Sequence, residues 1–387
     1  MSGIYIHIPF CKQACSYCDF YFVTRDRLIP SFVDTLIQEV STVASLYPKA
    51  RSILTDPLKT LYLGGGTPSR LNSEQLYRLV EALRRRFNLN HLQEFTVEVN
   101  PEDLTRQWLK DLKRLGVTRL SVGIQSFQPE LLSFMHRAHS AAQAHHALEM
   151  ITDTGFDSFS VDLIYGNPDQ TDRQLEDDLR QLLHYQPPHV SAYALTIEPQ
   201  TRLGKQHQLG RLTPAEDDLV AEQGRIIMET LADAEIYSYE VSNYARSGHE
   251  AVHNSAYWRH ENYLGLGTAA HSFFWLPEKH AAVRWQQPRD IHSWQQRVTS
   301  PANAQDHIVT ETLGRTTLAG ERVMLGLRTR AGISREELAA RYRYTLTGDQ
   351  EKTVALLREK ELMEPEEPLR LTPDGMAVAD AVTRQLL

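Results

Sequence analysis

The sequence is poor in cysteine, and this alone excludes a disulfide scaffold. Cys11, Cys15 and Cys18 are the only three cysteines in 387 residues, and they fall within eight positions. Three clustered thiols cannot form the paired bridges of a small secreted domain. No stretch approaches ~18 consecutive apolar residues, which excludes a transmembrane helix. The N-terminus also lacks the basic and apolar segments of a signal peptide. We therefore expect a cytoplasmic protein in a reducing compartment.

An excess of positive charge is also absent. Lysine and arginine number 41 against 49 aspartate and glutamate residues, giving a formal net charge of −8. Phosphate neutralisation supplies most non-specific affinity for nucleic acids, so no nucleic-acid partner is expected. Hydrophobic residues make up 41% of the chain, an ordinary balance for a soluble globular protein. The length suggests two or three domains.

Residues 1–235 alternate between short apolar runs and amphipathic stretches. The expected strands are 4–10, 60–66, 95–99, 119–124, 158–166 and 189–195, and the expected helices are 31–47, 72–87, 105–116, 141–155 and 171–185. Ser31 is a candidate N-cap of the first helix, and Gly116 a C-terminal glycine of the third. Strand–helix units in series predict parallel strands joined by right-handed crossovers. Both an open doubly wound sheet and a partial barrel fit, and both bind ligands at the carboxyl ends of the strands.

The remaining chain has a different character. Residues 236–310 break into short runs rich in Tyr, Trp, His and Asn, whereas 311–387 are helical and include a hairpin-like stretch before a final helix. This helix–helix–helix–hairpin order resembles a winged helix. The segment carries 12 basic and 13 acidic side chains, so packing or partner docking is favoured over DNA binding. We expect domain boundaries near 235 and 310.

The spacing C-x3-C-x2-C places the three cysteines on one loop directly after the first expected strand. Soft thiolates bind zinc, Cu(I) or iron–sulfur clusters. A zinc site would need His7 or Asp19 as its fourth ligand. A [4Fe-4S] cluster on three cysteines would instead leave one iron open to a group that is not protein. Inert structural cysteines are a third interpretation, although these are usually scattered through a core.

Polar residues and glycines stand at the ends of the other expected strands. "LGGGTP" (63–68) follows the second strand, and glycines there would let the backbone approach a ligand closely. Glu98 and Gln125 end the third and fourth strands, Arg137 lies in the expected helix that follows, and Asp162 lies in the fifth strand. Each alone could be a capping or surface residue. Together, at successive strand ends, they indicate a ligand site.

The stretch "YIHIPFCKQACSYCDF" resembles the cluster loop of the radical S-adenosylmethionine (SAM) superfamily. The resemblance implies a partial (β/α)6 TIM-like barrel with a smaller C-terminal helical, winged-helix-like domain. It also implies a [4Fe-4S] cluster on Cys11, Cys15 and Cys18, with SAM on the fourth iron. In that chemistry the reduced cluster cleaves SAM to methionine and a 5′-deoxyadenosyl radical. The residues that match the family's SAM site are Gly65, Gly66 and Thr67 at the amino group, Glu98, Gln125, Arg137 and Asp162 at its polar rim, Tyr5 and Tyr17 near the cluster, and Ala194 near the adenine.

Further segments, among them "VGIQSF", "YEVSNYA" and "YLGLGTAAHS", resemble the group that contains oxygen-independent coproporphyrinogen III dehydrogenase and the HemW-like heme chaperones. Phe20 stands where the dehydrogenase has a fourth cysteine, and only ten residues precede Cys11, which favours the chaperone. "HNSAYW" (253–258) matches a motif linked to heme binding. The resemblance thus implies heme, with His253 as axial ligand of its iron and Asn254, Tyr257 and Trp258 beside it.

On residues alone, the favoured interpretation is that His253 and Asn254 cap a loop and that Tyr257 and Trp258 fill a core. The resemblance further implies heme-accepting apo-cytochromes as partners, including membrane-bound respiratory subunits, a location at the membrane periphery and a homodimer. Porphyrinogen dehydrogenase activity is the alternative function.

Overall fold

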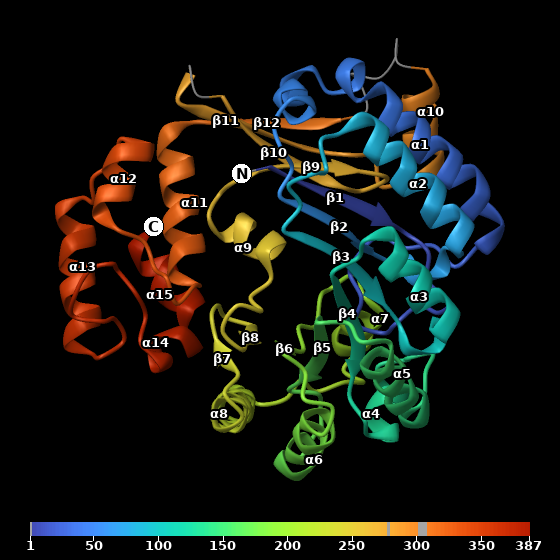
Figure 1. Cartoon of the computed structure of the whole chain (residues 1–387). Helices are drawn as coiled ribbons and strands as arrows, with labels where there is room; N and C mark the ends of the chain where they lie inside the picture. The colour runs from blue at the N-terminus through green and yellow to red at the C-terminus, as the bar shows by residue number, and fades with distance from the viewer. Residues whose placement is uncertain (1, 277–278, 301–307) are drawn as a thin grey trace.

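The computed structural model describes residues 2–276, 279–300 and 308–387, which form one twelve-stranded sheet flanked by helices. Six neighbouring strands of this sheet are parallel and follow chain order (Figure 1). They are β1 (Ser2–Ile8), β2 (Thr60–Gly65), β3 (Glu94–Val99), β4 (Arg119–Gln125), β5 (Ser158–Tyr165) and β6 (His189–Ala194). This arrangement confirms the predicted α/β barrel-type fold.

Helices cover the outer face of these strands. They are α1 (Ile29–Leu46), α2 (Ser73–Arg86), α3 (Arg106–Leu115), α4 (Pro129–Phe134), α5 (Ala141–Thr154), α6 (Asp172–Leu183) and α8 (Asp217–Asp233), whereas the short helix α7 (Arg202–Gln208) does not cover this face. Strand β1 shows how the sequence separates the two faces. Ile4, Ile6 and Ile8 are fully buried in the main hydrophobic core, whereas Tyr5 and His7 alternate with them and point to the other face. That other face is the interior of the barrel.

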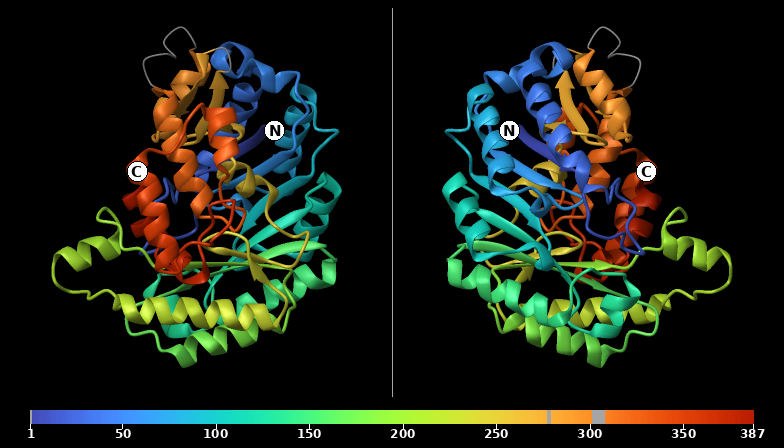
Figure 2. Two further views of the ribbon diagram at one scale, coloured as in Figure 1. Left: turned by 90° about the vertical axis from the view of Figure 1, so that its left-hand side faces the viewer. Right: turned by 90° about the vertical axis from the view of Figure 1, so that its right-hand side faces the viewer.

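Several helix ends differ from the sequence-based expectation. Ser31 is not an N-cap, because α1 already begins at Ile29 with Pro30 in its first turn, where a missing N–H costs nothing. Gly116 does end α3, in a left-handed conformation with φ 88°. The helix α8 was not predicted at all, since its apolar face is narrow and its stretch lacks a capping side chain. In Figure 2, α7 extends away from the barrel.

The predicted middle segment, 236–310, lengthens the sheet at both edges. Strands β8 (Asn243–Ala245) and β7 (Tyr237–Ser238) continue beyond β6, and β9 (Asn262–Leu266) pairs in parallel with β1. Antiparallel strands β10 (His271–Leu276), β11 (Ala281–Gln286) and β12 (Val309–Leu313) follow β9. The segment also contains α9 (Val252–Trp258) and α10 (Ile291–Thr299), and its residues 301–307 lie outside the described part of the chain.

The C-terminal helices form a second hydrophobic core that also includes Phe273 and Ala282. They are α11 (Arg315–Leu327), α12 (Arg335–Tyr342), α13 (Gly348–Glu359), α14 (Pro373–Ala377) and α15 (Ala379–Leu386). Between α13 and α14 the chain doubles back, with a bridge from Met363 to Leu371. Figure 1 places these helices on one side of the sheet, and α11 contacts α9. Among the described residues, no helix is long and apolar enough to cross a membrane.

Candidate cofactor site in the barrel lumen

A cavity of about 510 Å³ occupies the interior of the barrel. It opens at the carboxyl ends of the strands, where the loop after β1 carries all three cysteines, each half-buried. The structure brings most of the predicted cofactor residues to its wall: Cys11, Cys15, Cys18, Tyr17, Gly65, Gly66, Thr67, Glu98, Gln125, Arg137, Asp162, Ala194 and Asn254. Tyr5, His253, Tyr257 and Trp258 are not part of that wall.

The thiols receive hydrogen bonds from neighbouring elements. Thr67 Oγ1 donates to Cys11 Sγ at 3.5 Å, and Arg137 Nη1 donates to Cys15 Sγ at 3.3 Å. Burial raises the pKa of the Cys11 thiol to about 11 and that of the Cys18 thiol to about 12. Three sulfurs on one loop, two of them with side-chain donors, form the soft donor set that an iron–sulfur cluster requires.

In the described part of the chain, no three His, Cys, Asp or Glu side chains are grouped closely enough to hold a single metal ion. A [4Fe-4S] cluster does not need such a group, because each cysteine binds a different iron atom. Neither His7 nor Asp19 completes a zinc site in this arrangement.

The sequence predicted that Arg137 lies in a helix. In the structure it lies in the loop between α4 and α5. The preceding His136 adopts a left-handed conformation with φ 55°, which ends the helical turn. The loop aims the guanidinium into the cavity, where Nη2 donates to Asn100 Oδ1 and to the Gly123 carbonyl, both at 2.8 Å. Asn100 Nδ2 in turn donates to Thr67 Oγ1 at 3.0 Å. Sequence reasoning missed Asn100, although its place directly after β3 was the same signal that identified Glu98.

Glycines at the end of β2 make room for Glu98. Gly65 has φ 110°, and its amide donates to Glu98 Oε2 at 3.0 Å. A Cβ on Gly64 would lie 2.7 Å from Glu98 Oε1, so any other residue there would displace this carboxylate. Tyr62 donates its hydroxyl hydrogen to the same Oε1 at 2.7 Å. Burial raises the pKa of Glu98 to about 7, although these hydrogen bonds favour its ionised form.

Asp162 anchors a hydrogen-bonded network deeper in the lumen. Ser121 and Ser160 donate to its two oxygens at 2.8 and 2.9 Å, and burial raises the pKa of the carboxyl. The cavity then continues to Arg119 and His189, the first residues of β4 and β6, and to Asn254 on α9. It therefore runs from the carboxyl ends of the strands to their amino ends, where α9 lies.

His253 is enclosed at this amino end. Its ring is 1% exposed, with Nδ1 2.7 Å from Thr60 Oγ1 and Nε2 2.7 Å from the Tyr257 hydroxyl. Burial lowers its pKa to about 3, so the ring is neutral. Tyr257 and Trp258 are half-buried, while Asn254 faces the lumen. The structure thus gathers the four motif residues on α9, at the opposite end of the barrel from the cysteines.

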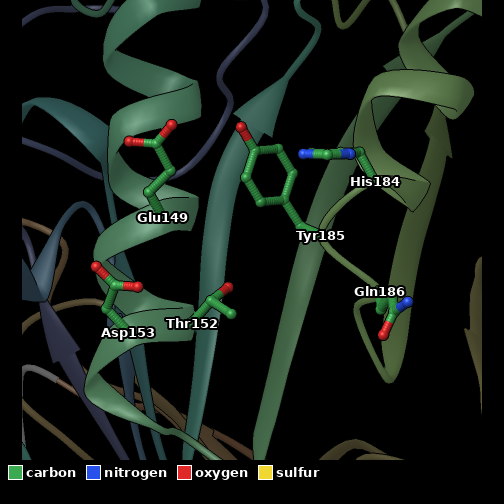
Figure 3. Close-up of a pocket in the computed structure, with 6 residues that line it drawn as sticks. All are labelled: Glu149, Thr152, Asp153, His184, Tyr185 and Gln186. Carbon is green, nitrogen blue, oxygen red and sulfur yellow. The ribbon is translucent and has the colours of Figure 1, made fainter.

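A second cavity of about 400 Å³ is an open depression on the outer helical layer (Figure 3). Glu149, Thr152 and Asp153 of α5 face residues 184–186 at the end of α6. It contains none of the residues predicted from the sequence.

Comparison with known proteins agrees with this site. Residues 5–182 match the family model described as the radical SAM superfamily. The chain is 32% identical to "Heme chaperone HemW" of Lactococcus lactis, covering 100% of this chain and 97% of that protein. It is 34% identical to the protein of the same name from Bacillus subtilis, covering 99% and 98%. A solved structure of coproporphyrinogen III oxidase (HemN) from Escherichia coli, a radical SAM enzyme, superimposes with a TM-score of 0.82 at 21% identity, covering 100% of this chain and 89% of that one.

Proposed function

The chain belongs to the radical SAM superfamily and, within it, to the family of HemW heme chaperones, and from this premise we propose that it binds heme and transfers it to acceptor proteins. Full-length identity of 32–34% to proteins named as heme chaperones is the observation that carries this proposal. The motif "HNSAYW" on α9 and Phe20 in place of a fourth cysteine support it.

We further propose that Cys11, Cys15 and Cys18 hold a [4Fe-4S] cluster and that the lumen binds SAM. With both groups bound, a reduced cluster would supply the electron that cleaves SAM to methionine and a 5′-deoxyadenosyl radical. Several features support this assignment: the shared loop of the thiols, the donors Thr67 and Arg137, and the glycines that leave space beside Glu98. The chain's own residues then orient the cofactor and shield it from water.

For heme, we propose His253 as the axial ligand, with Asn254, Tyr257 and Trp258 beside the porphyrin. Because both ring nitrogens of His253 have protein partners, iron binding requires one nitrogen to lose its hydrogen bond. The proposed acceptors are apo-cytochromes, including membrane-bound respiratory subunits, which a cytoplasmic homodimer would meet at the membrane surface.

The decisive experiment is a heme titration of anaerobically reconstituted protein, followed by optical absorbance. Saturable binding near one heme per chain supports the proposal. His253→Ala should weaken heme binding, whereas the control His292→Ala, at an exposed histidine, should not. Absence of specific heme binding would overturn the chaperone assignment. Formation of protoporphyrinogen from coproporphyrinogen III would instead establish the alternative dehydrogenase activity.

A further inference from the structure

Tyr62 contacts both functional ends of the lumen. Its hydroxyl donates to Glu98 Oε1 at 2.7 Å, on the side where SAM is proposed to bind. Its ring lies against His253, with centroids 5.0 Å apart and an interplanar angle of 28°. One side chain thus joins the carboxylate of the proposed SAM site to the histidine of the proposed heme site.

The backbone of α9 is firmly held, so a change at this end must involve the His253 side chain. The Glu94 carboxylate accepts the backbone N–H groups of Val252 and His253 at 2.8 and 3.1 Å. The preceding amide, at Ala251, donates to the Tyr239 hydroxyl at 3.2 Å. With the start of the helix fixed, heme binding requires the His253 side chain itself to turn, so that one ring nitrogen leaves Thr60 or Tyr257 and the packing of the ring on Tyr62 changes.

We propose that Tyr62 couples the two sites, so that a cationic ligand at Glu98 promotes the release of His253 for heme binding. This inference rests on the proposed function. SAM carries a sulfonium cation and an amino group, and either competes with the Tyr62 hydroxyl for the Glu98 carboxylate. Without that hydrogen bond the Tyr62 ring is free to move away from His253. A ligand shifts such an equilibrium only through contacts that differ between the two states, and the Tyr62–Glu98 hydrogen bond is such a contact.

Reciprocity gives the proposal a quantitative form. If SAM strengthens heme binding by some factor, heme must strengthen SAM binding by the same factor. Coupling of ordinary size predicts about a fivefold or greater tightening of heme binding by SAM. Tyr62→Phe retains the aromatic ring but lacks the hydroxyl, so its ring is free to move whether or not SAM is bound. This variant should bind heme equally well with and without SAM, which reduces the factor to about one.

The experiment is a heme titration of anaerobically reconstituted protein, with and without saturating SAM, in the absence of reductant so that SAM stays intact. The variants are Tyr62→Phe and the control Thr60→Val. The control removes a hydroxyl that contacts His253 but not Glu98. It should alter heme affinity while retaining the wild-type response to SAM. Equilibrium dialysis of labelled SAM, with and without heme, measures the reciprocal factor.

The outcomes separate the two proposals. If the wild-type protein binds no heme, the chaperone function fails and the coupling with it. If it binds heme equally well with and without SAM, the function stands and the coupling is wrong. A Tyr62→Phe protein that retains the wild-type response also overturns the coupling. Loss of the response in Tyr62→Phe but not in Thr60→Val supports it.

Discussion

At the scale of the residue, Glu98 is a buried carboxyl group that ionises near neutral pH. Burial raises its pKa to about 7, so the neutral form dominates below that pH and the carboxylate above it. A sulfonium cation binds the carboxylate better. SAM affinity should therefore fall about tenfold between pH 8 and pH 6, following the ionised fraction. Equilibrium dialysis on anaerobically reconstituted protein measures this change.

Glu98→Gln is the matched control for this pH dependence. It keeps the size of the side chain but cannot ionise, so its SAM affinity should be weaker at pH 8. The pH dependence that belongs to this carboxyl should also disappear. Equal affinity of the wild-type protein at both pH values would remove Glu98 from the binding site.

Cys15 is one of the three proposed ligands of the cluster. Cys15→Ala should abolish the cluster, because two cysteines cannot replace the three that the site offers. The fold should survive, since Cys15 is half-buried on the rim of the cavity and lies outside the hydrophobic cores. Iron content and visible absorbance after anaerobic reconstitution measure the loss. The exposed Lys12 on the same loop supplies the control Lys12→Ala, and stoichiometric iron in Cys15→Ala would contradict the ligand assignment.

At the scale of the element, α2 begins with a reciprocal cap. Asn72 Oδ1 accepts from the Gln75 amide and Gln75 Oε1 accepts from the Asn72 amide, both at 2.9 Å. Asn72→Ala should lower the free energy of unfolding by about 1 kcal/mol, because a backbone donor loses its partner. Urea titration measures this loss. Asn90→Ala, at an exposed turn position, should change stability by less than about 0.5 kcal/mol, and an equal effect of the two would argue against the cap.

Local sequence patterns predict the starts of several helices but not the conformation of the loop at Arg137. Asn72, Ser140 and Thr171 begin their helices as capping chemistry predicts. The loop at Arg137 does not follow from local preference, since a tertiary contact with Gly123 and Asn100 holds it. The same contact directs the Arg137 guanidinium to Cys15 Sγ.

At the scale of the whole molecule, a buried polar network joins the barrel to its extension. Arg297 of α10 donates to the Tyr47 hydroxyl at 2.9 Å and to Gln287 Oε1 at 3.0 Å. Tyr47 in turn donates to the fully buried Glu39 of α1, whose other oxygen accepts the Gly267 amide at 2.8 Å. Segments that lie far apart in the chain therefore share one network.

Removal of the Arg297 cation from this buried network should destabilise the protein strongly. Arg297→Met leaves polar groups buried without their partner and should lower the free energy of unfolding by about 3–5 kcal/mol. Urea titration followed by circular dichroism tests this value. Arg85→Met, at an exposed position on α2, should stay within about 0.5 kcal/mol of wild type. A similarly small effect of Arg297→Met would show that packing alone holds the extension in place.

The sequence by itself determined the order of the β/α units and the chemistry of the cysteine loop. Both are local: a period of two or 3.6 residues marks a strand or a helix, and three thiols within eight positions share one loop. Parallel strands place their carboxyl ends together, so Glu98, Gln125 and Asp162 could be assigned to one site without a structure. The family resemblance added the heme motif.

Only the tertiary structure decided how these parts meet. Thr60 and His253 are 193 residues apart in the chain, yet a 2.7 Å contact joins them. Tyr62 and Glu94 carry no local pattern of function, because their partners come from another strand and from α9. The curvature of the sheet around a lumen places the cysteine loop and α9 at opposite ends of one cavity. That relation depends on three-dimensional packing, which residue spacing does not specify.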